Sequence, residues 1–243
     1  DDGIWRFKDG AGYYAQLLKN YTTTDLNGDQ IHALGLAQVA RIHGEMQGIM
    51  KATGFTGSLQ DFFRFIREDP RFYAPNTEEG RALYLAETEK AKQQITALLP
   101  QYFGILPKAP LVVKRVEPFR EKSAGKAFYQ GPSPDGSRPG TYYANLYNMA
   151  DMPLVEVDAL FYHEGLPGHH LQRTIQTELT NVPPFRRFGG FTAYTEGWGL
   201  YSEKLAKDMG LYTDPYRDFG RLQLELHRAI RLVVDSGLHH KKW

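Results

Sequence analysis

One stretch of the chain, residues 162–172, reads Tyr-His-Glu-Gly-Leu-Pro-Gly-His-His-Leu-Gln. It opens like the zinc-site pattern His-Glu-x-x-His, in which two imidazoles share one helix face with a glutamate beside them. Here the fifth position is Pro167, and the next histidine is His169. On a regular helix His169 would point about 120° away from His163, and His170 would lie about 10 Å further along the axis. A regular helix therefore cannot place a second histidine beside His163.

Pro167 and Gly168 indicate how the chain can overcome this spacing. Proline removes a helical hydrogen bond and glycine accepts unusual backbone angles. We therefore expect the helix over 154–180 to lose its regular hydrogen bonding across Gly165–Gly168. Two imidazoles could then share a metal at about 2.0–2.1 Å from each nitrogen. Geometry alone does not choose between His169 and His170 as the second ligand.

A second stretch, residues 194–203, reads Tyr-Thr-Glu-Gly-Trp-Gly-Leu-Tyr-Ser-Glu. Glu196 follows His163 by 33 residues, a plausible distance for a third ligand from a following helix. Gly197 is expected to let another backbone approach closely. Glu203 lies on the same helix face as Glu196, where it could orient an imidazole or simply pair with Lys207 at the surface.

A third group of charged residues alternates with apolar ones near the end of the chain. Arg228, Arg231, Asp235 and His239 follow one another at spacings of three and four, so they share one helix face. The pattern predicts a helix packed between a core and a polar cavity. The two arginines could equally be members of structural ion pairs.

Composition excludes several classes of protein. Lys plus Arg is 29 and Asp plus Glu is 28, a balance that argues against nucleic-acid binding driven by bulk charge. No apolar run approaches the roughly 18 residues of a membrane span, so no transmembrane segment is expected. The chain has no cysteine, which excludes disulfides, thiolate zinc ligands and a cysteine nucleophile. Any metal site must therefore use His, Asp or Glu.

The remaining sequence predicts a mainly α protein with a small antiparallel β-sheet. We expect a single catalytic-type region over 1–243, helical over 1–110, a β-meander over 111–147, and helical again over 148–243 with the metal site. Helices are predicted at 13–20, 29–50, from Ser58, from Asn76 to Leu99 where Pro100 would stop it, and at 154–180, 191–209 and 214–236. Strands are predicted at 111–116, 126–130 and 141–146.

Three blocks of the sequence resemble the bacterial family catalogued as domain of unknown function 885. They are residues 163–172, residues 194–203 and the run Arg-Leu-Val-Val-Asp-Ser-Gly-Leu-His at 231–239. The opening Tyr-Thr-Thr-Thr-Asp-Leu at 21–26 and the helix at 31–50 also resemble it. That family is similar to the helical metallopeptidases of the gluzincin clan, which implies a zincin-like catalytic region. Its members are usually longer than this chain, so we expect a piece of a longer protein.

The resemblance implies a role for each residue of the cluster. His163, His169 and Glu196 take the ligand positions for Zn²⁺, and Glu164 takes the position of the general base. The family's members are often exported lipoproteins, which implies a periplasmic or lipid-anchored location.

The function that we expect is that of a zinc-dependent peptidase acting on a peptide or small-molecule substrate. A catalytic donor to the developing oxyanion is also needed, and Tyr143, Arg231 and His239 are the candidates, in no order. Two alternatives remain open. One is a non-catalytic peptide- or ligand-binding protein with a degenerate metal site, and the other is a zinc-dependent amidase or esterase.

Overall fold

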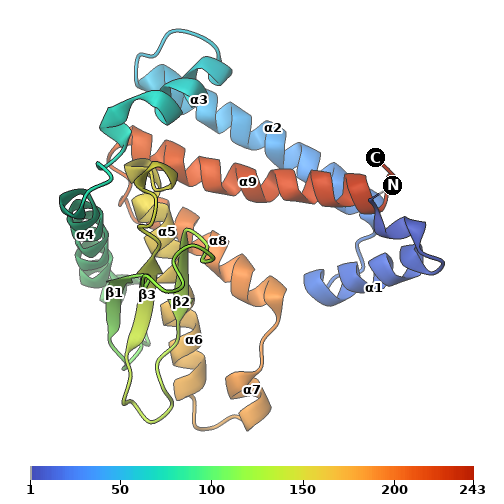
Figure 1. Ribbon diagram of the computed structural model, residues 1–243. Coiled ribbons are helices and arrows are strands. Elements are labelled where there is room, and N and C mark those ends of the chain that lie inside the picture. The colour runs from blue at the N-terminus through green and yellow to red at the C-terminus, as the bar shows by residue number, and fades with distance from the viewer. Residues whose placement is uncertain (1) are drawn as a thin grey trace.

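The computed structural model describes residues 2–243 and is mainly helical, with one small sheet (Figure 1). Its helices are α1 (Gly10–Thr22), α2 (Gly28–Ala52), α3 (Leu59–Glu68), α4 (Glu78–Tyr102), α5 (Val157–Glu164), α6 (His169–Glu178), α7 (Pro184–Phe188), α8 (Thr192–Asp208) and α9 (Pro215–His239). The strands are β1 (Leu111–Arg115), β2 (Ala127–Gln130) and β3 (Gly140–Ala144). The mainly helical class is thus confirmed. None of the helices over residues 2–243 is both long and apolar enough to cross a membrane.

Side-chain caps set the start of the early helices. At α3 the Ser58 side chain accepts from the backbone N–H of Asp61, whose own side chain accepts from the backbone N–H of Ser58. Asn27 and Gln30 form the same reciprocal cap at the start of α2. Each such cap satisfies donors that would otherwise lack a partner in the first helical turn. These starts agree with the sequence pattern.

Helix α4 differs from the prediction at both ends. Its N-terminal cap is Thr77, whose hydroxyl accepts from the backbone N–H of Gly80, and not Asn76. Pro100 lies inside the helix, which continues to Tyr102. Proline removes only its own donor, and the carbonyl of Leu99 still accepts from the N–H of Phe103 at 2.9 Å. The expected stop at Pro100 was therefore wrong.

The sheet is mixed, and the prediction of an antiparallel meander was wrong. Its strand order is β1-β3-β2, in which β3 pairs parallel with β1 and antiparallel with β2. After β1 the chain turns over residues 117–123 and forms β2 at the opposite edge of the sheet. Strand β3 then lies between β1 and β2. All five residues of β3 are buried, whereas β1 and β2 are only partly buried. A central strand buried on both faces suits the aromatic sequence of β3.

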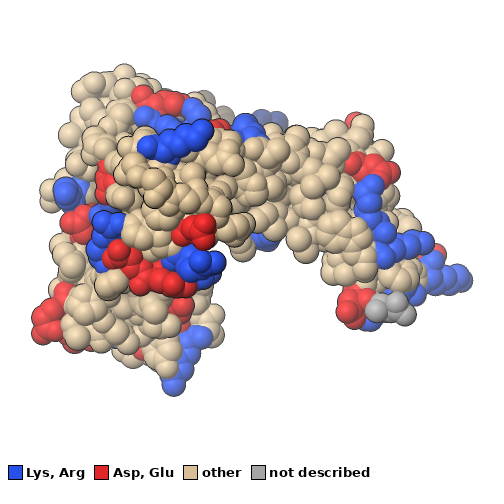
Figure 2. Space-filling model, turned by 90° about the horizontal axis from the view of Figure 1, so that it is seen from above, with Lys and Arg blue, Asp and Glu red and all other residues tan. Residues whose placement is uncertain are grey.

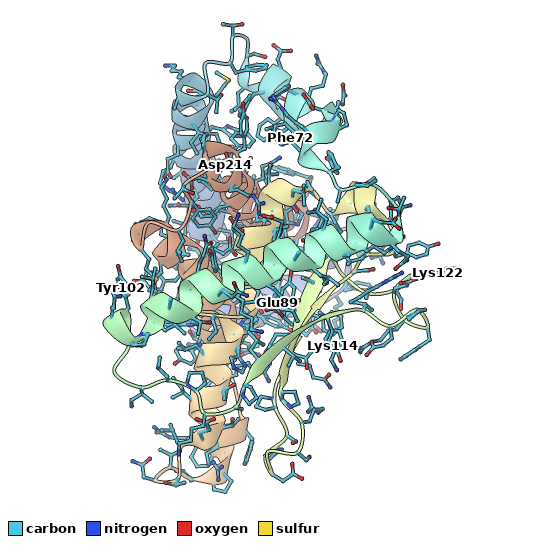
Figure 3. The ribbon with its side chains drawn as sticks, turned by 90° about the vertical axis from the view of Figure 1, so that its left-hand side faces the viewer. Phe72, Glu89, Tyr102, Lys114, Lys122 and Asp214 are labelled. Atoms are coloured by element: carbon cyan, nitrogen blue, oxygen red, sulfur yellow. The ribbon has the colours of Figure 1, made fainter. Side chains whose placement is uncertain are left out.

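The buried apolar side chains of the helices and the sheet form two clusters. In one, α2 and α9 lie side by side (Figure 1). Ile42, Met46 and Phe219 are fully buried in their core, together with residues of α3. In the other, α4 crosses the molecule beside β1 (Figure 3). Tyr84 and Ile95 of α4 are fully buried there. Burying each such side chain stabilises the fold by about 1.5–3 kcal/mol. Helices α5 and α8 pack against each other between these regions.

Candidate metal centre

The chain departs from helical geometry between α5 and α6, as the sequence predicts. Helix α5 ends at Glu164, a cis peptide bond joins Leu166 to Pro167, and α6 begins at His169. The N–H of His170 donates to the carbonyl of Gly165 across this break at 3.0 Å. A Cβ at Gly168 would lie 1.9 Å from the backbone oxygen of His163, so the tight return of the chain requires glycine there. The interruption places the two ends of the motif side by side.

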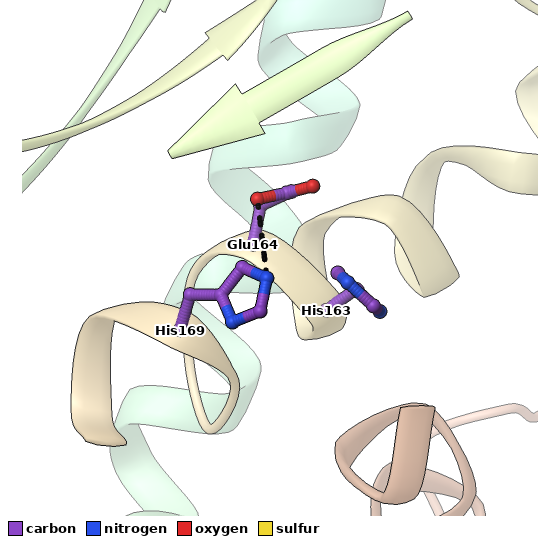
Figure 4. Close-up of side chains that lie close together, drawn as sticks. All are labelled: His163, Glu164 and His169. Atoms are coloured by element: carbon purple, nitrogen blue, oxygen red, sulfur yellow. Dashed lines mark ion pairs between the residues drawn. The ribbon is translucent and has the colours of Figure 1, made fainter. Parts of the chain in front are cut away.

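The side chains of His163 and His169 converge across this break (Figure 4). Their ring centroids are 4.7 Å apart and the rings are nearly perpendicular. Both imidazoles are buried. Glu164 completes a group in which each residue offers one ligand atom and all three atoms lie within 4.8 Å of one another.

Helix α8 brings two carboxylates to His163. Glu203 is buried and accepts from Nδ1 of His163 through Oε1 at 2.7 Å. That bond leaves Nε2 turned toward Glu196, whose Oε2 is 3.5 Å away. A carboxylate behind an imidazole is the usual partner that fixes the tautomer and orientation of a metal-binding histidine. Of the two roles considered for Glu203, the structure shows the buried partner of His163.

Glu196 lies between the two imidazoles. Its Oε1 is 3.6 Å from Nε2 of His169, and its Oε2 faces His163 as described above. Ligands about 2.0–2.2 Å from a tetrahedral zinc are separated from one another by about 3.3 Å. The observed spacings exceed this value by only a few tenths of an ångström. Each distance is to a different oxygen of Glu196, whereas the three residues whose single ligand atoms all lie within 4.8 Å of one another are His163, Glu164 and His169. Two imidazoles with carboxylates beside them are a donor set that zinc accepts.

The electrostatics of the cluster favour a bound cation. Burial alone would lower the pKa of His163, but hydrogen bonds with Glu196 and Glu203 and the charge of Glu203 outweigh it and raise the pKa to about 9. The same hydrogen bond with His163, together with one from His169, lowers the pKa of Glu196 far below its usual value. Without a metal the carboxylates therefore hold a proton on His163. A metal at Nε2 would replace that proton.

Glu164 has an environment different from that of Glu196. Burial raises the pKa of Glu164, although the nearby imidazoles of His163 and His169 counteract part of this effect. Its Oε2 is 3.8 Å from Nε2 of His169. A carboxylate with a raised pKa beside the ligands, without an ion pair to Lys or Arg among residues 2–243, is suited to accepting and returning a proton.

Arg228 of α9 is a member of this cluster that the sequence treated only as part of a charged patch. Its Nη1 donates to Oε2 of Glu196 at 3.3 Å, and its Nη2 lies 3.2 Å from Nε2 of His163. Nε2 of His163 has a single lone pair, so a metal bound to it would displace Nη2 of Arg228 from that position. The place of Arg228 on the same helix face as Arg231, three residues earlier, was the available signal.

Close helix approach at the cluster occurs at Gly199 and not at Gly197, where the sequence analysis placed it. A Cβ at Gly199 would lie 2.6 Å from Cε1 and 2.7 Å from Nε2 of His163. A Cβ at Gly197 would meet nothing within 4 Å. Gly199 therefore lets α8 pack directly against the imidazole.

We expect Gly199→Ala to lower thermal stability and to weaken zinc binding by about 10–100-fold, because the methyl group displaces the His163 ring. The matched control is Gly197→Ala, two residues away in the same helix. It should raise stability by about 1 kcal/mol through helix propensity and leave zinc affinity unchanged. Thermal unfolding and zinc titration of the two variants test this. Equal zinc affinity in both would contradict the packing argument.

The structure does not bring Tyr143 to the cluster. Its ring stacks on Phe128 at 4.9 Å, and the guanidinium of Arg120 lies 4.8 Å from its centroid. The neighbouring Tyr142 points to the other sheet face, where it contacts Phe161. Burial raises the pKa of Tyr142, and the charge of Glu164 adds to this effect. Alternation along β3 therefore assigns the cluster side to Tyr142.

Arg231 and His239 lie along α9 beyond the cluster. His239 lies about 16 Å along the helix axis from Arg228. It accepts a hydrogen bond from the backbone N–H of Ile4 at 3.1 Å. Both residues line a cleft of about 680 Å³ that also reaches Glu196. The predicted helix between a core and a cavity is thus present, although the cleft is walled largely by apolar side chains.

His170 faces away from His163 and forms a separate network. Its Nε2 is 3.1 Å from the carbonyl of Ala109, and its Nδ1 shares hydrogen bonds with Tyr129 and Thr174. Burial lowers its pKa to about 4, so the ring is neutral. His170 therefore joins α6 to the sheet, and His169 is the histidine beside His163.

Solved structures from two bacteria share this fold. The chain has 39% identity and a TM-score of 0.95 with "the putative lipoprotein from Colwellia psychrerythraea", covering 99% of this chain and 42% of that one. A "putative lipoprotein of unknown function from Shewanella oneidensis" has 17% identity and a TM-score of 0.70, covering 94% of this chain and 43% of that one. The chain thus spans less than half the length of either protein.

No curated protein matches the chain. The family described as "bacterial protein of unknown function (DUF885)" matches residues 2–243. This match covers all three sequence blocks, two of which carry the candidate metal centre. The chain therefore belongs to the DUF885 family of bacterial proteins.

Proposed function

We propose that the protein is a zinc-dependent peptidase of the gluzincin kind. The observation that carries the proposal is the convergence of His163, Glu164 and His169 across a break in the helix, with an oxygen of Glu196 within 3.6 Å of each imidazole. Three protein ligands with an open fourth position are typical of catalytic zinc, whereas structural zinc sites use four. Zinc in this place would supply an acidified water and polarise the substrate carbonyl.

Three side chains around the zinc position would have separate roles in the reaction. Glu164 accepts the proton of the attacking water and returns it to the leaving amine, and the raised pKa that burial gives it suits both steps. Glu203 holds the His163 ring in place from behind. Arg228 is the cationic donor in contact with the cluster, so it is our choice for stabilising the negative charge that develops on the carbonyl oxygen.

The cleft beside the cluster gives a substrate access to these groups. Glu196 and Arg228 line its inner end, and it extends along α1, α8 and α9. Its volume, about 680 Å³, is within the range typical of small-molecule sites. A short stretch of peptide therefore fits beside the zinc position.

Metal analysis joined to a hydrolysis assay tests the proposal. We expect protein purified without chelator to contain about one zinc per chain and to cleave peptides, with loss of activity on chelation and recovery on adding zinc. Zinc without cleavage of any peptide would favour a binding protein instead. Cleavage of esters or simple amides alone would favour a different hydrolase. Absence of zinc after exposure to it would refute the proposal.

We extend the proposal to location. Both solved structures are described as putative lipoproteins, which supports an exported, lipid-anchored protein. A peptidase there would act on peptides outside the cytoplasm.

A further inference from the structure

A cleft of about 680 Å³ runs from the metal cluster between α1, α8 and α9. Seen from above, the molecule is hollowed between the lobe that contains α1 and the larger body (Figure 2). Leu17, Leu18, Leu200 and Leu232 line its walls. Glu196 and Arg228 belong to the same lining, so whatever occupies the cleft lies next to the cluster.

The charged groups in this cleft have different partners. Asp235 accepts from the hydroxyl of Tyr14 at 2.7 Å. His239 accepts from a backbone N–H, and Arg228 pairs with Glu196. Arg231 is exposed and has no hydrogen bond or ion pair with any of residues 2–243. An unpaired guanidinium in an apolar-walled cleft is suited to binding an anion from the solution.

The position of Arg231 limits where that anion would be in a substrate. Arg231 is three residues beyond Arg228 on α9, which is about 4.5 Å along the helix axis. An extended peptide advances about 3.3 Å per residue. The guanidinium therefore reaches a group one or two residues from a carbonyl placed beside Arg228. In a peptide without acidic side chains, the anion at that distance is the C-terminal carboxylate.

We propose, on the basis of the peptidase function proposed above, that Arg231 binds the free C-terminal carboxylate of a short peptide. The fork of the guanidinium matches the two oxygens of a carboxylate. The leucines of the cleft wall receive the last, apolar side chain. The substrate class is then short peptides with a free C-terminus and an apolar C-terminal residue, cleaved one or two residues from that end.

A second arginine near the cluster provides a matched control. Arg173 is also exposed and lines a smaller hollow of about 230 Å³ on the α6 side of Glu196, with Gln176 and Thr195. That hollow lacks the leucine walls of the larger cleft. The two arginines thus flank Glu196 from different elements, and each can be changed to glutamine without touching a member of the cluster.

The test measures binding by calorimetry in the Glu164→Gln background, in which the peptide is not consumed. The probes are N-acetyl-Ala-Ala-Leu and its C-terminal amide. We expect the acid to bind at least 10-fold more tightly than the amide, since hydrogen bonds to charged groups are the stronger ones. Arg231→Gln should reduce this preference to less than 2-fold, and Arg173→Gln should leave it unchanged.

Three results would overturn the assignment: equal affinity for acid and amide, loss of the preference in Arg173→Gln but not in Arg231→Gln, and no binding of either probe. Thermal unfolding of each variant shows whether it is folded. A carboxylate preference that depends on Arg231, in a protein that cleaves no peptide, would leave this inference standing and refute the peptidase proposal. Cleavage of peptide acids and peptide amides at equal rates would support the peptidase proposal and refute the role of Arg231 in binding the carboxylate.

Discussion

Glu164→Gln is expected to lower peptide hydrolysis by about 10²–10⁴-fold while leaving zinc content unchanged. The substitution removes the group that accepts the proton of the water but none of the three ligands. Burial already disfavours the charged form of Glu164, as its raised pKa shows. A neutral amide in its place therefore costs little, and the melting temperature of the metal-free protein should stay the same or rise.

The measurement combines steady-state kinetics, zinc analysis and thermal unfolding of the same preparation. His163→Ala is the control, because it removes a ligand and should lose zinc and activity together. Equal zinc loss in Glu164→Gln and His163→Ala would mean that Glu164 is a ligand. Retention of full activity would exclude it as the base.

The second large effect is expected at Glu196. Glu196→Ala should weaken zinc binding by more than the roughly 10–100-fold that is typical of losing an outer hydrogen-bond partner of a ligand. The reason is its position: its two oxygens lie 3.5 and 3.6 Å from Nε2 of His163 and of His169. Because the side chain of Glu196 is about half exposed, its removal should leave the fold intact.

Glu203→Gln is the matched comparison in the same helix. Its side chain is buried, and its hydrogen bond within residues 2–243 is to Nδ1, the far nitrogen of His163, so an amide oxygen can still accept that bond. We expect a loss of zinc affinity within about 10–100-fold. Competition with a zinc chelator gives both affinities. A larger loss in Glu203→Gln than in Glu196→Ala would move the third ligand seven residues along α8.

The helices and their order could be predicted from the sequence because their signals are local. Ser58 and Asp61 mark the start of α3 by a cap that involves one turn only. The periodic apolar residues of α2 and α9 need no knowledge of their partners. Gly168 indicated the break before α6, because a side chain at this position would collide with the backbone oxygen of His163.

The sheet order could not be predicted in this way. Strand pairing joins residues that are distant in sequence, such as Leu111 and Gly140, and the turn over 117–123 is compatible with either neighbour. Which strand becomes central depends on what covers it. Tyr142 is buried against α5 through Phe161, a contact that no local pattern contains.

The candidate site likewise has features that the sequence predicts and features that only the tertiary structure shows. By itself the sequence predicted the residue types, because ligand chemistry is a property of side chains and spacing. It placed His163 and Glu164 before the helix break, left His169 and His170 open after it, and put Glu196 on a later helix. Only the tertiary structure decided that Glu203 lies behind His163, that Gly199 admits the imidazole, and that Arg228 rather than Tyr143 reaches the cluster. Those contacts depend on how α5, α8 and α9 cross, and crossing is set by packing across the whole core rather than by any one segment.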